Sequence, residues 1–302
     1  MVKLDTKYIR SLLRPRNKEG HKGSYGTLQC IVGSDCYRGA SVLSAMGALR
    51  SGAGIVRICS VEKACAAVAK TYPSATLLPL ADNGAGMISA KEIGRIIEAS
   101  SSASALLIGC GLGQSADTAA VVGFLLSAFK GGAVVDADAL NLIALGGNAR
   151  QTLSVCGAAY PTRVITPHIG EMSRLTGKSA DIIKREPEIA AAEFSAEYGC
   201  VTVLKDYRTV IAVPDASEAF GASTYLWERP NSGLAKGGAG DVLAGLIGGF
   251  LAQGYSAADS AVLGVGIHGI AAEMCASERT EDAMLPSELG EYICRAFSSI
   301  SV

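Results

Sequence analysis

The chain has 302 residues, of which 49% are hydrophobic and 18% are charged, so it carries ample material for the core of a globular α/β protein. Its 27 lysines and arginines nearly balance 28 aspartates and glutamates, which argues against nucleic acid or an acidic membrane surface as a partner. The N-terminal stretch lacks the apolar core of a signal peptide, and the apolar stretch at 242–254 is too short to span a bilayer. We therefore expect a soluble, cytoplasmic protein.

Segments typical of strands and helices alternate along most of the chain. Continuous apolar runs predict strands at 27–33, 54–61, 75–80, 105–113, 133–140 and 163–171. Helices are expected between them, at 39–52, 62–70, 89–99, 116–129 and from 172 to 198. After Cys200 the segments 201–214 and 223–230 suggest antiparallel strands, and two or three helices follow.

This alternation predicts an α/β fold with a mostly parallel central sheet covered by helices on both faces. No linker or repeat divides the sequence, so residues 1–302 are expected to form a single domain.

The cysteines predict reduced thiols, most of them buried, as in a cytosolic protein. Their number is odd, most lie in apolar runs, and no C-x-x-C pair occurs. The nine are Cys30, Cys36, Cys59, Cys65, Cys110, Cys156, Cys200, Cys275 and Cys294.

Glycine or polar residues occupy the ends of the predicted strands, which is where parallel sheets bind ligands. These stretches are GSDCYRGA, GCGLG, DADALN, TPHIGE and KDYRT, and a sixth, GGAGD, opens an apolar helix. A glycine-rich turn that leads into a helix directs free N–H groups and the positive end of the helix dipole at one point, which suits a phosphate. Asp241 in that first turn is also compatible with simple helix capping.

Two other glycine motifs do not fit the nucleotide sites that they resemble. GCGLG at 109–113 lacks the G-x-G-x-x-G spacing and a suitably placed acidic residue, so a Rossmann cofactor site is not expected. The TGKS stretch at 176–179 lacks the first glycine of a P-loop, because that position is Met172.

The remaining polar residues each allow two interpretations. Asp136 and Asp138 fit either a strand-end turn or a ligand or metal site. His168 and Glu171 fit either a structural histidine with a favourable helix-dipole contact or a functional pair. Lys205 could extend along the surface or meet a phosphate. Together they predict an anion-binding cleft with carboxylates, a setting for phosphoryl transfer.

The turn Gly238-Ala239-Gly240-Asp241 resembles the G-x-G-D signature of the ribokinase-like superfamily. With HKGSYGTLQCIVGS, YRGASVLSAMGALRSGAG, GCGLG, DADALN, TPHIGE and VLKDYRTVI in the same order, the sequence from about 21 to 269 resembles the ADP-dependent NAD(P)H-hydrate dehydratases. The resemblance implies a ribokinase-like three-layer sandwich. It also implies a lyase for metabolite repair, which restores NADH or NADPH from its (S)-hydrate while ADP becomes AMP and phosphate.

The resemblance also implies roles for individual residues. Asp241 is implied as the general base, with Gly238 and Gly240 forming the anion hole. The implied pocket for hydrated NAD(P)H adds Ala40, Gly111, Gly113 and His168 to Asp241. The implied nucleotide-binding residues are Lys205, Asp206, Tyr207, Arg208, Thr209 and Gly240.

Glu171 is implied to help hold Mg²⁺. ADP is the implied co-substrate, and a homo-oligomer of four or more subunits is implied, without nucleic acid or membrane partners.

Three positions depart from the family pattern without removing a catalytic group. Cys110 stands where proline is usual, Asp206 where glycine is usual, and Ile169 where proline is common. Two alternatives remain, a vitamin-precursor kinase of the same superfamily and a catalytically silent nucleotide-binding module. Conversion of ADP to AMP in the presence of hydrated NADH distinguishes the dehydratase from both alternatives. The sequence does not distinguish ADP from ATP, or hydrated NADH from hydrated NADPH.

Overall fold

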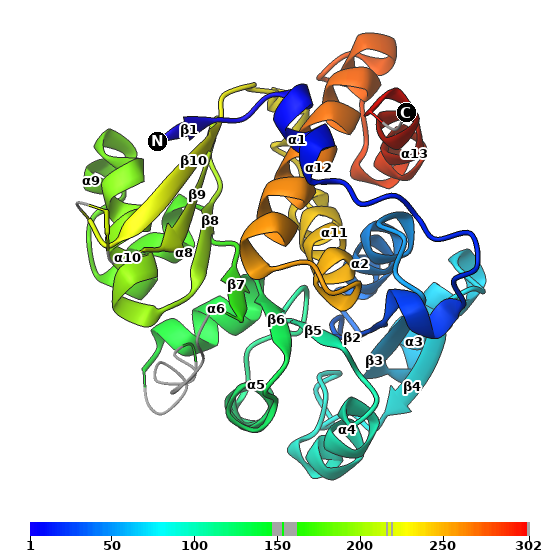
Figure 1. Cartoon of the computed structure of the whole chain (residues 1–302). Coiled ribbons are helices and arrows are strands. Elements are labelled where there is room, and N and C mark those ends of the chain that lie inside the picture. The colour runs from blue at the N-terminus through cyan, green and yellow to red at the C-terminus, as the bar shows by residue number, and fades with distance from the viewer. Residues whose placement is uncertain (147–152, 154–161, 216, 219, 301–302) are drawn as a thin grey trace.

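The computed structural model describes residues 1–146, 153, 162–215, 217–218 and 220–300. In this part of the chain the strands form one ten-stranded sheet with the order β1-β10-β9-β8-β7-β6-β5-β2-β3-β4 (Figure 1). The strands are β1 Val2–Lys3, β2 Thr27–Ile31, β3 Ile55–Val61, β4 Thr76–Leu80, β5 Ala105–Ile108, β6 Gly132–Val135, β7 Arg163–Ile165, β8 Val201–Leu204, β9 Thr209–Pro214 and β10 Ala222–Trp227.

Helices occupy most of the described connections between these strands. They are α1 Thr6–Leu12, α2 Arg38–Arg50, α3 Glu62–Thr71, α4 Ile93–Ser100, α5 Ala116–Ala128, α6 Ala137–Ala144, α8 Ile169–Thr176, α9 Ala180–Arg185, α10 Pro187–Tyr198, α11 Ala239–Ala252, α12 Ala257–Arg279 and α13 Leu289–Ile300. Short 3₁₀ turns are η1 Lys22–Tyr25, η2 Ala90–Glu92, η3 Ser232–Leu234 and η4 Pro286–Glu288.

The direction of the strands follows from the length of their connections. Between described strands, β9 is the one that pairs antiparallel with both of its neighbours, and the other pairs are parallel. Only residues 205–208 join β8 to β9, and such a short connection requires a hairpin. The antiparallel pairing predicted after Cys200 is confirmed, although β8 also pairs parallel with β7.

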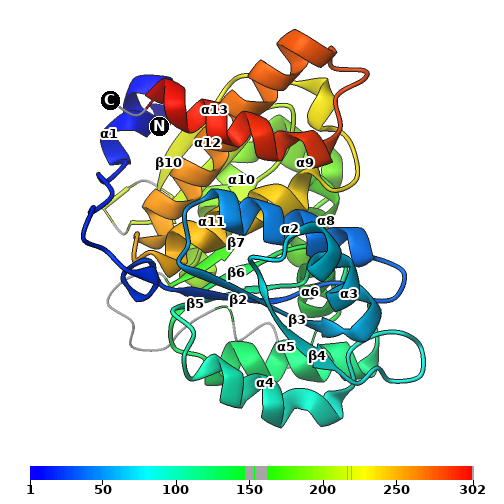
Figure 2. The ribbon, with the colours of Figure 1, turned by 90° about the vertical axis from the view of Figure 1, so that its right-hand side faces the viewer.

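Helices cover both faces of the sheet, which gives three layers (Figure 2). One face packs against α2, α11 and α12, with α13 lying against α12 and α2, and the other face packs against α4, α5, α6, α8 and α10. Along β5, Leu107 belongs to the core of the first face, whereas Leu106 and Ile108 belong to the core of the second. Because both faces are buried, the strands are apolar at successive positions, and the predicted fold class is confirmed.

Helices α2 and α11 touch through their backbones along what we call the α2–α11 seam. A Cβ atom at Gly47 would overlap the carbonyl oxygen of Val242, and one at Gly245 would overlap that of Ser44. Helix α11 is buried along almost its whole length, which explains why it is apolar on all sides. The glycines therefore let two helices approach more closely than side chains would permit.

Two predicted strands are longer than the observed ones. The segment 105–113 ends as a strand at Ile108, because Gly109, Gly111 and Gly113 adopt positive φ angles and turn the chain. The segment 133–140 ends as a strand at Val135, and α6 begins two residues later.

The helices expected after the antiparallel strands are α11, α12 and α13, and the longest apolar one is α12. By length and composition α12 could cross a membrane, but 78% of its apolar window is buried inside the fold, as in the core helix of a soluble protein. All eight described cysteines are free and six are buried, as predicted, whereas Cys156 lies outside the described residues.

Candidate active site

The carboxyl ends of the parallel strands and the N-terminus of α11 meet at one edge of the sheet. The N–H of Gly33 after β2 donates to the carbonyl of Cys110 after β5, at 2.8 Å. After β7 and β8, the N–H of Lys205 donates to the carbonyl of Pro167, also at 2.8 Å. The stretches singled out by their polar residues therefore do converge.

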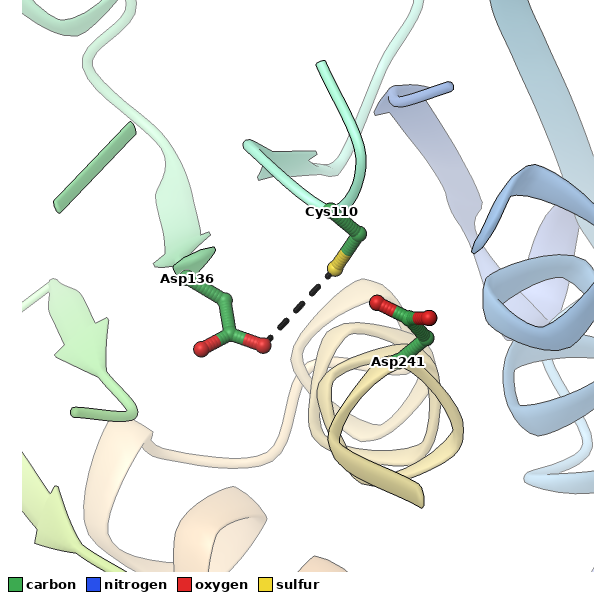
Figure 3. Close-up of side chains that lie close together, drawn as sticks. All are labelled: Cys110, Asp136 and Asp241. Carbon is green, nitrogen blue, oxygen red and sulfur yellow. Dashed lines mark hydrogen bonds between the residues drawn. The ribbon is translucent and has the colours of Figure 1, made fainter. Parts of the chain in front are cut away.

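Three side chains from different elements point toward one another at the centre of this edge (Figure 3). Cys110 follows β5, Asp136 follows β6 and Asp241 lies in the first turn of α11, and their thiol and carboxylate atoms lie within 4.8 Å of one another. The Cys110 thiol donates to Asp136 Oδ2 at 3.8 Å. Burial raises the pKa of the Cys110 thiol well above its usual value, and the two carboxylates raise it further, so the thiol is protonated.

Lys205 supplies the cation that contacts the acidic cluster, the name we give to Cys110, Asp136 and Asp241. Its Nζ lies 2.9 Å from Asp136 Oδ1, and the side chains of Lys205 and Asp136 are 21% and 2% exposed. Burial works to lower the pKa of Lys205, but the carboxylates of Asp136 and Glu171 raise it above its usual value. Lys205 is therefore charged and held in place, and does not merely extend along the surface.

Asp136 and Asp138 take different partners because α6 starts between them. Ala137 has a φ of 50°, an unfavourable backbone angle for a residue with a side chain. Asp136 makes no side-chain capping bond, while Asp138 accepts from the N–H of Gly113 at 2.8 Å. Asp136 thus contributes to the acidic cluster, and Asp138 fixes the glycine turn after β5.

The glycine turn before α11 has the form expected of an anion hole. Gly238 has a φ of 104°, and a Cβ there would overlap a methyl group of Leu43, so the position requires glycine. Gly240 and Asp241 precede the first intrahelical bond, which Val242 donates to Gly238, so their N–H groups are available to a ligand. A Cβ at Gly240 would lie 3.4 Å from Lys205 Nζ, so its absence leaves room beside that cation.

Two carboxyl groups of the site have strongly raised pKa values. Burial, followed by the charge of Asp136, raises the pKa of Asp241 to about 7. Burial also raises the pKa of Glu171 to about 7, against the opposing effect of Lys205. With Asp136, these groups form three carboxyls near one lysine, so the site carries excess negative charge when all are ionised. Perturbed pKa values of this kind are typical of functional sites.

His168 and Glu171 form a reciprocal cap at the start of α8. His168 Nδ1 accepts from the N–H groups of Gly170 and Glu171 at 2.9 and 3.2 Å, and Glu171 Oε2 accepts from the N–H of His168 at 2.9 Å. The interpretation of His168 and Glu171 as helix-capping residues is therefore confirmed, and it leaves a further role of either side chain open. The cap leaves the imidazole of His168 53% exposed at the site, whereas Glu171 is buried.

The residues expected to bind hydrated NAD(P)H lie around the same edge. Gly111 approaches Ala40 so closely that an added Cβ would lie 2.6 Å from the Ala40 methyl group. A Cβ at Gly113 would lie 2.6 Å from the sulfur of Met87. Ala40, Gly111 and Gly113 therefore make a close-packed wall in which larger side chains would not fit.

The residues expected to bind the nucleotide follow one another along the β8–β9 hairpin. Lys205 reaches the acidic cluster, whereas Asp206 and Tyr207 are exposed. Arg208 lies 3.8 Å from Glu188 and 3.9 Å from Glu228. Thr209 begins β9.

Sequence reasoning did not assign roles to several residues of the site. It named Cys110 only as a departure from a family pattern and left Asp136 and Asp138 undecided. It missed His268, which α12 places 6% exposed near Ala239, with no hydrogen-bond partner for Nε2 among the described residues. Burial, against a hydrogen bond with the backbone of Ala239 and with help from the charge of Lys205, lowers the pKa of His268 to about 4, so the ring is neutral. A lone histidine in an apolar helix offered no signal of this position.

The donor atoms of the site fit Mg²⁺. This ion prefers oxygen ligands and is commonly held by one or two carboxylates. Asp136 and Asp241 offer carboxylate oxygens close to each other, and the protonated thiol of Cys110 beside them is a poor ligand for this ion. Glu171 is not part of this close group, and its Oε2 accepts from the N–H of His168.

A three-layer α/β fold with a glycine turn, a helix N-terminus and a carboxylate at the carboxyl edge of its sheet defines a protein of the ribokinase-like class. Residues 28–295 match the family model described as NAD(P)H-hydrate dehydratase. The chain belongs to this family.

Relatives cover nearly the whole chain. It is 32% identical over 296 residues to the ADP-dependent (S)-NAD(P)H-hydrate dehydratase of Bacillus subtilis, covering 96% of this chain and 95% of that protein. It is 35% identical to the bifunctional NAD(P)H-hydrate repair enzyme of Moorella thermoacetica, covering 96% of this chain but 52% of that protein. The chain thus spans about half the length of the bifunctional relatives that it matches.

A solved structure agrees with this relationship. The ADP/ATP-dependent NAD(P)H-hydrate dehydratase of Bacillus subtilis, co-crystallised with ATP and Mg²⁺, has a TM-score of 0.78 and 28% identity, with 98% of each chain covered. The ribokinase-like three-layer fold implied by the sequence is therefore confirmed.

Proposed function

We propose that the protein converts (S)-hydrated NADH or NADPH back to the intact dinucleotide and splits ADP into AMP and phosphate. The observation that carries the proposal is the position of Asp241. Its carboxyl group has a pKa of about 7, lies in the first turn of α11 and adjoins the glycine turn. Family membership and the relative named for this reaction alone, which the chain covers almost completely, support the same function.

In the proposed reaction, Asp241 accepts the proton of the hydroxyl group on the hydrated ring. A pKa near 7 suits a base that works at neutral pH, since the carboxylate form is populated and still basic. The hydroxyl oxygen attacks the terminal phosphoryl group of ADP, which releases AMP and leaves a phosphate ester. The lone pair of the ring nitrogen then expels phosphate, and loss of a proton from the adjacent ring carbon restores the double bond.

The surroundings of Asp241 favour charge on a transferring phosphoryl group. The N–H groups of Gly240 and Asp241 and the dipole of α11 supply fixed positive ends. Lys205 adds a full charge beside the open space at Gly240. These groups are already in place without ligand, which is the arrangement that stabilises a transition state most effectively.

We further propose that carboxylates at this edge, Glu171 among them, hold Mg²⁺ when nucleotide binds. The ion supplies neutralisation of the phosphate charges. The carboxyl groups of Asp136, Glu171 and Asp241 repel one another, and Lys205 offsets that repulsion only in part, so the site favours a further cation.

The two substrates are assigned to different sides of Asp241. Ala40, Gly111, Gly113 and His168 are proposed to contact hydrated NAD(P)H, and the exposed imidazole of His168 can stack on a ring or donate from Nε2. Residues Lys205 to Thr209 and Gly240 are proposed to bind ADP. We also propose that residues 1–302 form one domain and that the protein is cytoplasmic. It is further proposed to be a homo-oligomer of four or more subunits, and light scattering after size exclusion measures that number.

The test is to incubate the protein with chemically hydrated NADH, ADP and Mg²⁺. We expect the absorbance of reduced nicotinamide to return while AMP and phosphate appear in equal amounts. Phosphorylation of a vitamin precursor without response to hydrated NADH would identify a kinase. Nucleotide binding with neither reaction would identify a silent module. Replacing ADP by ATP in the same assay determines the preferred nucleotide.

A further inference from the structure

A cavity of about 930 Å³ lies at the end of α2 and α11 remote from the candidate active site. Its walls come from the N-terminal connection between α1 and β2, the last residues of α2 and α11, and Phe297 and Ile300 of α13. Figure 2 shows this N-terminal connection at the left edge of the molecule, beside the end of α2. The volume is within the range of small-molecule sites, about 300–1,000 Å³.

The described residues that line the cavity include several arginines and no acidic side chain. Arg10, Arg14, Arg16 and Arg50 all line it, and no aspartate or glutamate does. Within the described residues, none of the four takes part in a salt bridge. Since the whole chain carries a net charge of −1, this concentration is local and does not reflect composition.

Helix capping accounts for part of the cluster. Arg16 donates to the carbonyl of Gly52 after α2 at 2.9 Å, and Arg14 donates to the carbonyl of Gly254 after α11 at 3.3 Å. Cations are favourable at helix C-termini. Each of these bonds uses one nitrogen of a guanidinium group, which carries five N–H donors, so most of the donors remain available.

Aromatic rings fix these two guanidinium groups. The guanidinium carbon of Arg16 lies 3.7 Å from the ring centre of Tyr25, and that of Arg14 lies 4.3 Å from the ring centre of Tyr255. Such stacking orients a guanidinium group before a ligand arrives, which lowers the entropy lost on binding.

Arg10 and Arg50 lie in the last turns of α1 and α2, where the helix dipole favours a cation. Neither guanidinium group has a hydrogen-bond acceptor among the described residues, although the two come from different helices and line the same cavity. Guanidinium groups bind phosphate oxygens with two parallel bonds, so several of them around one space favour a ligand with more than one phosphate.

We propose that this cavity binds a small polyanion that carries two or more linked phosphate groups. A nucleoside polyphosphate and an inorganic polyphosphate share this chemistry. The aromatic rings of Tyr25, Phe250 and Phe297 also line the cavity, and stacking of a base on them would favour the nucleoside polyphosphate. The proposal concerns a site separate from Asp241 and does not depend on the dehydratase activity.

The test compares two double variants that remove the same charge. Arg10→Gln/Arg50→Gln alters the cavity, and Lys184→Gln/Arg185→Gln alters an exposed pair at the end of α9. Inorganic tripolyphosphate and ATP are titrated calorimetrically into each protein without Mg²⁺ at physiological salt. Hydrogen exchange of residues 10–17 and 50–54 locates the bound ligand.

We expect tripolyphosphate to protect these two segments in the unmodified protein, and its affinity there to fall at least tenfold in Arg10→Gln/Arg50→Gln. The Lys184→Gln/Arg185→Gln control should stay within about twofold. Equal losses in both variants, or protection confined to residues 238–241, would overturn the proposal. With the arginine dependence present, tighter binding of ATP supports a nucleotide as the ligand and equal binding supports the phosphate chain alone.

Discussion

Replacing Asp241 by asparagine should make the protein more stable and nearly inactive. Asparagine keeps the size of the side chain but cannot accept a proton, so turnover of hydrated NADH should fall by about 10²–10⁴-fold. The stability change follows from the raised pKa of Asp241, because the ionised carboxylate is unfavourable where burial and Asp136 oppose it.

The size and the pH range of this effect follow from linkage. The pKa of Asp241 is raised from 3.8 to about 7 in the folded protein. Below pH 4 both states are protonated and the substitution should have little effect. Between pH 4 and 7 the unfolded chain ionises first, so folding stability decreases as pH rises, and above pH 7 the cost is complete. Three pH units correspond to ~4 kcal/mol, and screening at this partly exposed side chain reduces the gain from Asp241→Asn to about 2–4 kcal/mol at pH 8.

Urea unfolding at pH 4.5 and pH 8 measures this difference. Asp259→Asn is a matched control, because Asp259 is also the third residue of its helix, α12. Loss of its contact with the helix dipole should destabilise by about 0.3–1 kcal/mol at pH 8, the opposite sign. If Asp241→Asn destabilised the protein at pH 8, or kept near-normal turnover, Asp241 would be an ordinary capping residue and our assignment would be wrong.

The remaining predictions concern the side chains around Asp241. Glu171→Gln should raise the Mg²⁺ concentration for half-maximal activity several-fold. It should leave the melting temperature at pH 7.5 unchanged or higher, since it removes a carboxylate whose pKa is raised to about 7. Unchanged Mg²⁺ dependence would restrict the role of Glu171 to helix capping. His168→Asn keeps an acceptor at the helix start, so it should weaken binding of hydrated NADH more than binding of ADP, whereas His168→Ala should also lose about 1 kcal/mol of stability. Equal losses of affinity for both ligands in calorimetry would contradict a substrate role. Lys205→Met leaves the 2% exposed Asp136 without its cation and should cost about 3–5 kcal/mol in urea unfolding. Adding Asp136→Asn should recover part of that loss, and no recovery would show that Lys205 stabilises the fold in another way.

Local sequence patterns were sufficient to predict the fold and the parts of the site that lie within one turn. Gly238, Gly240 and Asp241 occupy adjacent positions at a helix start, so their joint geometry follows from the backbone of that turn. The buried strands were recognisable because both of their faces are covered, which leaves no polar alternation. Strand ends were less accurate, because positive φ angles after β5 break the strand within an apolar run.

Contacts between distant segments could not be predicted in this way. Asp136 and Lys205 are 69 positions apart, and their pairing depends on β6, β7 and β8 lying side by side. The arginine-lined cavity was hidden for a similar reason, since Arg50 joins three arginines of the N-terminal segment only in the folded chain. A balanced total charge gives no sign of such local excess.

The backbone contact along the α2–α11 seam limits how the site can respond to its ligands. Ala40 lies near the start of α2 and Asp241 at the start of α11, so two residues of the proposed site belong to helices whose backbones are in direct contact. We therefore expect any movement on ligand binding to occur in segments outside this pair. The turn that carries Gly86 and Met87 is one such segment, because it lies outside both helices and Met87 packs against Gly113 of the proposed site. The carbonyl of Gly86 accepts from the N–H of Asp35 at 2.8 Å. Amide exchange in α2 and α11 should then require global unfolding, while exchange in this turn should respond to substrate.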